Sequence, residues 1–180
     1  MMDNDVDINL EELSKGLPGL SSRIGSYLSE AGGYCLQKNS HNPGSTLSIQ
    51  GLFDKSCRIY WKYNVSDQIK NSYADEQEAV EFGACGIAIS TIVKLTRYTV
   101  IKRSCKGTGF DYWLGEKESD LPFEGNARLE VSGIMRGTEE EIKKRIKIKI
   151  DQTKQSDHLS IPAIIAITEF SHPVCNLVQR

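Results

Sequence analysis

The chain has 180 residues, of which 39% are hydrophobic and 26% are charged, a balance typical of a soluble globular protein with one domain and at most a small extension. This composition excludes a disordered, fibrous or membrane-embedded chain. The 22 basic and 24 acidic residues leave a formal net charge of −2, which excludes a global positive field, so any site for a polyanion must be local.

The sequence carries no pattern typical of a membrane or secreted protein. Its longest strongly apolar stretch, residues 161–170, is far shorter than the roughly 20 residues that a membrane-spanning helix needs. The acidic start has no apolar signal region, and the 5 cysteines are scattered without paired spacing. We therefore expect a cytoplasmic protein with neither a membrane partner nor a disulfide framework.

Residues 1–65 are interpreted as an N-terminal extension made of a helix and a β-hairpin. Ser21 or Ser22 can cap a short helix, which we expect to end at the glycine pair 32–33. Residues 46–52 and 57–63 have strand-like patterns, and the four residues between them are few enough for a hairpin.

Residues 66–180 are interpreted as an α/β core that begins with a long helix. Few residues between 67 and 96 break a helix, and the stretch becomes apolar after Glu81, which predicts a helix buried on most sides. Gly83 and Gly86 each weaken a helix by about 1 kcal/mol, so they indicate close packing on a neighbour. A bend or break is expected near Gly83.

Three strand patterns follow this helix, at residues 97–104, 110–114 and 127–134. Thr138 and Glu141 form a capping-box pattern that opens a second helix, which runs to about residue 155. Part of this segment, RIKIKI, also alternates with period two, so a strand remains an alternative there.

Residues 162–170 are expected to form a fully buried strand. The predicted order is therefore helix, three strands, helix and strand, behind the N-terminal helix and hairpin. This order predicts a mixed α/β layer structure.

Two acidic residues lie on short strands that are otherwise apolar. Asp111 lies in FDYWL and Glu130 in RLEVSG. Since desolvating a charge costs several kcal/mol, such acids need partners. Acids on paired strands can meet, because neighbouring strands lie about 4.8 Å apart, and they repel unless they are protonated or bridged by a cation. Mg²⁺, which proteins typically hold with one or two carboxylates, is the natural bridge.

The arrangement resembles the PD-(D/E)XK nuclease superfamily, whose restriction-endonuclease-like core also runs helix, three strands, helix and strand. The resemblance covers roughly residues 76–170. It implies that Asp111 and Glu130 ligate Mg²⁺, and that Glu81 matches an acid on the first helix. The implied chemistry is metal-assisted hydrolysis of a phosphodiester.

The sequence departs from this family at the lysine two residues beyond the second acid, where it has Ser132. That lysine is thought to position or activate the attacking water, so its absence bears on catalysis. Lys102, Lys106 or Arg128 are candidates to supply the missing charge. Arg128 can equally form a structural ion pair with Glu130, since residues two apart on a strand share a face.

The helix after the second acid is the expected nucleic-acid surface. In the family it often carries a basic or glutamine residue that faces the site, and the positions that match are Lys147, Lys149 and Gln152. Lys143, Lys144 and Arg145 add to a basic run that can follow a phosphate backbone. A solvated helix face is the alternative, because acids at 139–141 partly offset this charge.

We therefore expect a small nuclease-like protein that hydrolyses or binds nucleic acid with Mg²⁺, in bacterial antiviral or mobile-element defence as the resemblance implies. The first alternative is a catalytically inactive nuclease-like subunit that binds a partner protein through the N-terminal helix and hairpin. The second is a homo-oligomer whose buried acids pair with Arg128 or Lys102.

Overall fold

The computed structural model describes residues 6–118 and 125–180, which form a mixed α/β structure. In chain order the elements are β1 (Asp7–Asn9), the 3₁₀ helix η1 (Leu10–Lys15), α1 (Ser22–Lys38), β2 (Ser45–Gly51), β3 (Lys55–Tyr60), α2 (Asp67–Ser72), α3 (Glu76–Leu95), β4 (Tyr98–Arg103), β5 (Tyr112–Glu116), β6 (Ala127–Ile134), α4 (Glu139–Thr153), the 3₁₀ helix η2 (Lys154–Leu159), β7 (Ala163–Glu169) and β8 (Val174–Gln179).

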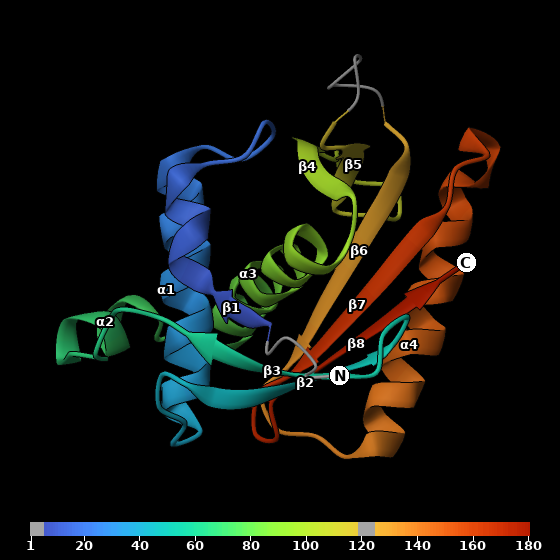
Figure 1. The fold of residues 1–180 in the computed structure, drawn as a ribbon. Coiled ribbons are helices and arrows are strands. Elements are labelled where there is room, and N and C mark those ends of the chain that lie inside the picture. The colour runs from blue at the N-terminus through green and yellow to red at the C-terminus, as the bar shows by residue number, and fades with distance from the viewer. Residues whose placement is uncertain (1–5, 119–124) are drawn as a thin grey trace, which may run out of the picture.

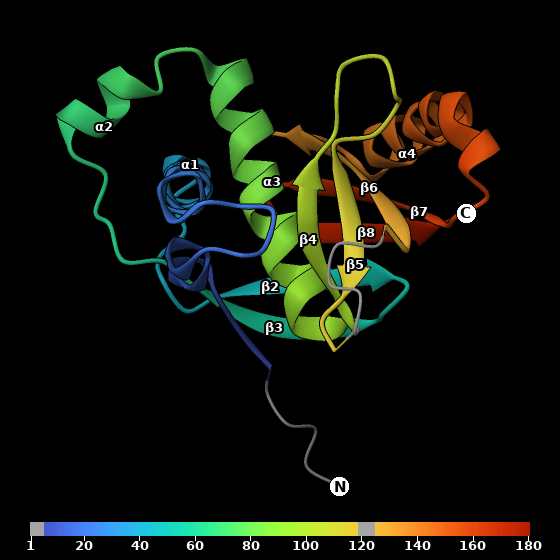
Figure 2. The ribbon, with the colours of Figure 1, turned by 90° about the horizontal axis from the view of Figure 1, so that it is seen from above.

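Within the described residues, eight strands form one sheet in the order β1-β3-β2-β8-β7-β6-β5-β4 (Figure 1). Helix α4 covers one face of β6 and β7, and α3 crosses the opposite face (Figures 1 and 2). Helix α1 packs on α3 as a further layer. None of the described helices combines the length and apolar character that crossing a membrane requires.

The predicted long helix over residues 67–96 is two helices, α2 and α3, and the break lies at residues 73–75 rather than near Gly83. Asp75 adopts an extended backbone conformation, and its carboxylate accepts hydrogen bonds from the N–H groups of Gln77 and Glu78. Because this cap satisfies free N–H groups of a new helix, α3 begins there. Tyr73, at the end of α2, is held by stacking on Tyr34, with 5.1 Å between ring centroids.

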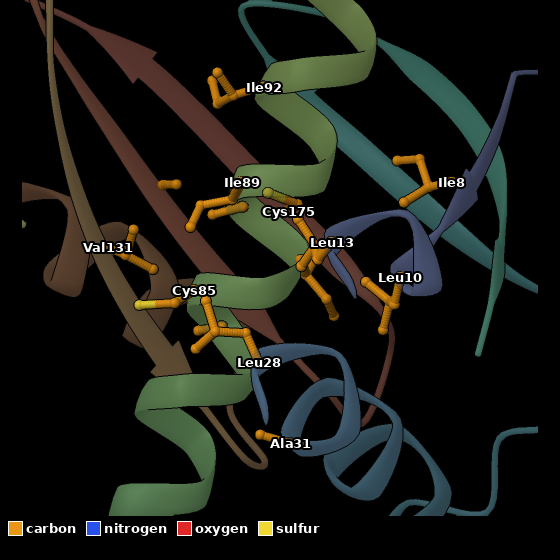
Figure 3. Packing of buried hydrophobic residues seen from close by; sticks show 14 of the residues in the cluster. Ile8, Leu10, Leu13, Leu28, Ala31, Cys85, Ile89, Ile92, Val131 and Cys175 are labelled. Carbon is orange, nitrogen blue, oxygen red and sulfur yellow. The ribbon is translucent and has the colours of Figure 1, made fainter. Parts of the chain in front are cut away.

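The expected close packing at the glycines of α3 is confirmed. A Cβ atom at Gly86 would lie 2.5 Å from the carbonyl oxygen of Leu28, and one at Gly83 would lie 3.0 Å from that of Ala31. The backbones of α1 and α3 can therefore approach closely. Figure 3 shows Ala31 on one side of α3 and Val131 of β6 on the other, so α3 forms the centre of the core.

The predicted end of the first helix at Gly32 and Gly33 is wrong, since α1 continues to Lys38. A Cβ atom at Gly33 would lie 2.7 Å from the Trp61 ring, and one at Gly32 would lie 3.0 Å from the Leu10 side chain. The two glycines make room for these large groups. Burial of the apolar face of α1 outweighs a glycine cost of about 1 kcal/mol each.

The predicted hairpin is present, because β2 and β3 pair antiparallel. Its strands also extend the main sheet: β2 pairs in parallel with β8, and β1 pairs in parallel with β3. The sequence analysis predicted neither β1 nor β8. The described part of the first 65 residues thus shares one sheet and one core with the rest of the chain.

The expected order of helix, three strands, helix and strand is present from α3 to β7. Strands β4, β5 and β6 pair antiparallel, and β6 pairs in parallel with β7. The alternative of a strand in RIKIKI is wrong. Both hydrogen bonds of the Thr138–Glu141 capping box are formed, and the isoleucines spaced four apart on α4 pack on β7.

Gly133 on β6 sets how closely α3 approaches the sheet. A Cβ atom there would lie 2.5 Å from both Cγ1 and the carbonyl oxygen of Val80, and 3.0 Å from the Cβ of Ala84. This close approach brings the N-terminal part of α3 against the end of β6. It therefore positions any α3 side chain that reaches the edge of the sheet there.

We expect Gly133→Ala to lower the free energy of unfolding by about 1–3 kcal/mol, because the added methyl group meets backbone that cannot move without shifting α3. For a domain of this size each kcal/mol lowers Tm by roughly 2–4 °C. Differential scanning calorimetry checks this prediction. A Tm equal to that of the wild type would contradict the close approach of α3 and β6.

Candidate active site

A pocket of about 480 Å³ opens beside the first residue of β5, where β6 continues without it. β5 pairs with β6 only as far as the Tyr112–Leu129 position, so beyond it β6 has no strand partner on that side among the described residues. The pocket lies between α3 and α4, at this open edge of the sheet. It is lined by Gln77, Val80 and Glu81 of α3, by Asp111, by Glu130, Val131, Ser132 and Gly133 of β6, and by Arg145, Lys149 and Gln152 of α4.

The two polar residues that β6 contributes to the pocket, Glu130 and Ser132, lie on one face of the strand. Its alternate residues Arg128, Glu130 and Ser132 contact α4, and the apolar residues between them face α3. Four residues of a helix rise about 6 Å and two residues of a strand about 6.6 Å. Polar residues four apart on α4 therefore meet residues two apart on β6, as Ser132 meets Arg145 and Glu130 meets Lys149.

Glu130 is the buried acid of the site, with 2% of its surface exposed. Its Oε1 accepts hydrogen bonds from Lys149 Nζ at 2.6 Å and from Gln152 Nε2 at 2.9 Å. Both donors converge on Oε1, and the carboxyl group of Asp111 lies within hydrogen-bonding reach of Glu130. Burial, and then the negative charge of Asp111, raise the pKa of Glu130 to about 7, although Lys149 opposes this shift.

Asp111 immediately precedes β5 and is held against the edge of β6. Its N–H donates to the carbonyl oxygen of Leu129 at 2.8 Å, and Tyr112 is also the partner of Leu129. Two residues opposite one is the geometry of a β-bulge, which re-aims a side chain. The Oδ2 atom of Asp111 then accepts the N–H of Val131 at 2.9 Å. The carboxylate thus takes the place of a strand partner for β6 just before β5 begins.

Arg103, at the end of β4, is the cation that faces Asp111. Its Nη2 lies 3.6 Å from Asp111 Oδ1, and its Nη1 donates to the hydroxyl of Tyr112. The guanidinium carbon lies 4.6 Å from the centroid of the Tyr112 ring. Arg103 is therefore anchored on Tyr112 while it contacts the acid.

The cations that the sequence analysis offered in place of the missing lysine lie elsewhere. Lys102 and Lys106 are exposed and do not line the pocket. Arg128 is buried, but it donates to Ser156 Oγ at 2.6 Å and to the carbonyl oxygen of Ile161 at 2.8 Å. Its carboxylate partner is Asp157, at 3.7 Å, so the structure does not show the Arg128–Glu130 ion pair considered above.

Of the other predicted residues, Glu81 and Gln152 line the pocket. Lys143, Lys144 and Lys147 are exposed outside it, and Lys143 forms an ion pair with Glu139 at 2.7 Å.

Arg145, which the sequence analysis placed in the basic run with Lys143 and Lys144, also lines the pocket. The available signal was spacing, since Arg145, Lys149 and Gln152 stand at positions i, i+4 and i+7 of one helix face.

The pocket has the donor chemistry to hold one hard divalent cation. No group of three or more His, Cys, Asp or Glu residues within 6–118 and 125–180 is placed to hold a metal. Mg²⁺ is nevertheless usually bound by only one or two carboxylates, together with water and phosphate oxygens. Asp111 and Glu130 fit this requirement. Burial, and then the charge of Asp111, raise the pKa of Glu130, and a bound cation would oppose both effects by stabilising the ionised carboxylate.

Burial of Glu130 predicts a pH dependence of stability. The pKa of this group is raised to about 7 in the folded chain, from an ordinary value of 4.5, so the folded chain binds more protons between these pH values. Its contribution to stability is therefore complete below about pH 4.5 and is lost as the pH rises through 7. The slope is at most about 1.4 kcal/mol per pH unit.

We expect Glu130→Gln to remove this slope, because the amide has the shape of the protonated acid and does not titrate. Urea unfolding of both proteins at intervals from pH 5 to 8 measures it. The stability of the wild type relative to the variant should fall as the pH rises. A constant or rising difference would show that Glu130 is ionised throughout.

Comparison of the chain with protein-family models, with curated proteins and with solved structures found no match. The site is thus defined by its own geometry: two carboxylates at the open edge of β6, with basic side chains of α4 and β4 beside them.

Proposed function

We propose that the chain is a metal-dependent phosphodiester hydrolase that acts on nucleic acid and has a restriction-endonuclease-like core. The observation that carries this proposal is the convergence of Asp111 and Glu130 in one pocket beside Lys149. A structural ion pair needs one acid and one base. A second carboxylate that raises the pKa of the first works against such a pair but favours a bound cation.

The arrangement of elements supports the proposed core. Helix α3 is followed by three antiparallel strands, by α4, and by β7 parallel to β6. This is the order that the resemblance to PD-(D/E)XK nucleases implies. Asp111 lies directly before the second strand and Glu130 lies on the third, and Glu81 reaches the same pocket from the first helix.

Asp111 and Glu130 would hold Mg²⁺, which when bound polarises a phosphate and lowers the pKa of a water molecule. The protein's part is to keep these carboxylates in place. Arg103 and the N–H of Val131 hold Asp111, while Lys149 and Gln152 hold Oε1 of Glu130. Since these contacts exist before substrate arrives, little reorganisation is needed during the reaction.

Lys149 offers a positive charge where the family lysine is missing at Ser132. It lines the pocket, and its ammonium group lies 2.6 Å from Glu130. An ammonium group has three donors, so Lys149 can hold Glu130 and still donate to water or to a phosphate oxygen. In this proposal, α4 supplies the charge that β6 lacks.

Incubation with plasmid DNA, single-stranded DNA and RNA in Mg²⁺ or Mn²⁺ tests the proposal. We expect Asp111→Asn and Glu130→Gln each to lower the cleavage rate by about 100-fold or more, because each removes a charge that acts in the transition state. Glu139→Gln is the matched control, as this acid is exposed and lies outside the pocket.

Circular dichroism would confirm that each variant is folded. Cleavage that survives in a folded Asp111→Asn or Glu130→Gln protein would refute the proposed active site, as would the absence of cleavage in the wild type.

The alternative, a nuclease-like subunit without catalysis that binds a partner protein, is favoured by two exposed side chains on α1. Ile24 and Tyr27 are 52% and 39% exposed and lie about one turn apart. Removal of residues 1–65 would not test this reading, because it also removes strands β1, β2 and β3 and part of the core.

The variant Ile24→Ser is a sharper test, because it changes an exposed side chain of α1, whereas the Tyr27 ring also packs on Tyr73 and Phe82 at 5.7 and 5.0 Å between centroids. If this face binds a partner, we expect the variant to lose a protein that the wild type captures in fixed stoichiometry. Size-exclusion chromatography with light scattering measures this loss. Equal capture by both proteins would eliminate the α1 face.

A further inference from the structure

Arg145 forms no ion pair with an acid of the described chain; Glu141, one turn earlier on α4, feels its charge, but that carboxylate is bound to the N–H of Thr138. Its Nη1 donates to Ser132 Oγ at 2.8 Å and is 3.5 Å from the carbonyl oxygen of Gly133. No carboxylate of residues 6–118 or 125–180 lies within 4.0 Å of its guanidinium nitrogens. By contrast, Lys149 is paired with Glu130, and Arg103 faces Asp111.

The orientation of Arg145 leaves its best anion-binding edge free. Both contacts to β6 are made through Nη1, so Nε and Nη2 have no partner among the described residues. These two N–H groups form the planar fork that binds two oxygens of a phosphate at once. Arg145 is half-buried and lines the pocket, so a ligand held there is partly shielded from water.

The charge of the pocket also favours a single phosphodiester once a cation is bound. The lining residues include three acids, Glu81, Asp111 and Glu130, and two bases, Arg145 and Lys149. When all five are ionised, a divalent cation changes their balance from −1 to +1. A phosphodiester carries one negative charge, which would neutralise this net charge of +1.

We infer that Arg145 is a phosphate-binding residue, which holds non-bridging oxygens of a nucleic-acid phosphodiester in this pocket. The inference rests on the proposed function for the identity of the ligand. Ser132 is then a positioning residue: its hydroxyl holds Nη1 and turns the free edge of Arg145 away from β6. A lysine at position 132 could not accept this hydrogen bond, so in this proposal Ser132 has the specific role of orienting Arg145.

The test measures binding separately from cleavage. A short fluorescent single-stranded DNA with unmodified linkages is titrated with the wild type, Arg145→Gln and Arg145→Lys in Ca²⁺, a hard cation of the same charge with looser geometry than Mg²⁺, and the DNA is checked for integrity after each titration. Arg58→Gln is the matched control: Arg58 is exposed on β3, which lies four strands from β6 in the sheet.

We expect Arg145→Gln to raise Kd about tenfold or more, because hydrogen bonds to a charged group are lost. Its slope of log K against log salt should fall by about 0.7, which corresponds to one phosphate contact of a single strand. The Kd of Arg145→Lys should lie between those of the wild type and Arg145→Gln, because lysine keeps the positive charge but lacks the two parallel N–H donors. The control should bind like the wild type.

The outcomes separate this inference from the proposed function. If the wild type binds the DNA and a folded Arg145→Gln protein does not, but DNA is never cleaved in Mg²⁺ or Mn²⁺, then the phosphate site stands and the hydrolase proposal fails. If the wild type cleaves DNA and Arg145→Gln binds with unchanged Kd and salt slope, the inference is overturned and the hydrolase stands. No binding by the wild type overturns the inference.

Discussion

The contact between the buried carboxylate of Glu130 and the two donors of α4 is the interaction on which the pocket depends. A carboxylate with 2% exposure is stable only if its partners are in place, and Lys149 and Gln152 supply them at 2.6 and 2.9 Å. This requirement fixes the position of α4 along β6. Once that position is set, the matched rise of helix and strand brings Arg145 to Ser132 as well.

The opposite face of β6 is set by packing rather than by charge. Because Gly133 has no side chain, α3 can lie against the strand, and Glu81 reaches the pocket from its first turns. The two helices therefore clamp one strand edge from opposite sides, one through apolar contact and the other through charge. Asp111 closes the edge between them by accepting the N–H of Val131. Acids and bases of four elements meet there as a result.

The charges of the pocket are better explained by a ligand-binding site than by ion pairs that only stabilise the fold. Glu130 is buried, and the charge of the nearby Asp111 adds to the rise of its pKa. Both features cost stability when nothing is bound, and a cation would relieve both. Arg145 has the complementary character, with one edge bound to β6 and the other open. Stability lost at such positions is typical of functional sites.

The sequence alone determined the features that depend on residues close in the chain. The capping box at Thr138, the buried strand β7, the close-packed glycines of α3 and the acid Glu130 on an apolar strand all follow from local spacing, and the structure contains them. The other predicted strand acid, Asp111, lies directly before β5 and not on it. Only the tertiary structure decided which basic side chains pair with those acids. Lys149 and Arg103 meet Glu130 and Asp111 because of how α4 and β4 are placed on the sheet, and such placement comes from packing over the whole core. Tertiary packing also explains why α1 continues beyond Gly32 and Gly33. The helix packs there against Leu10 and Trp61, which are distant from the glycines in the sequence.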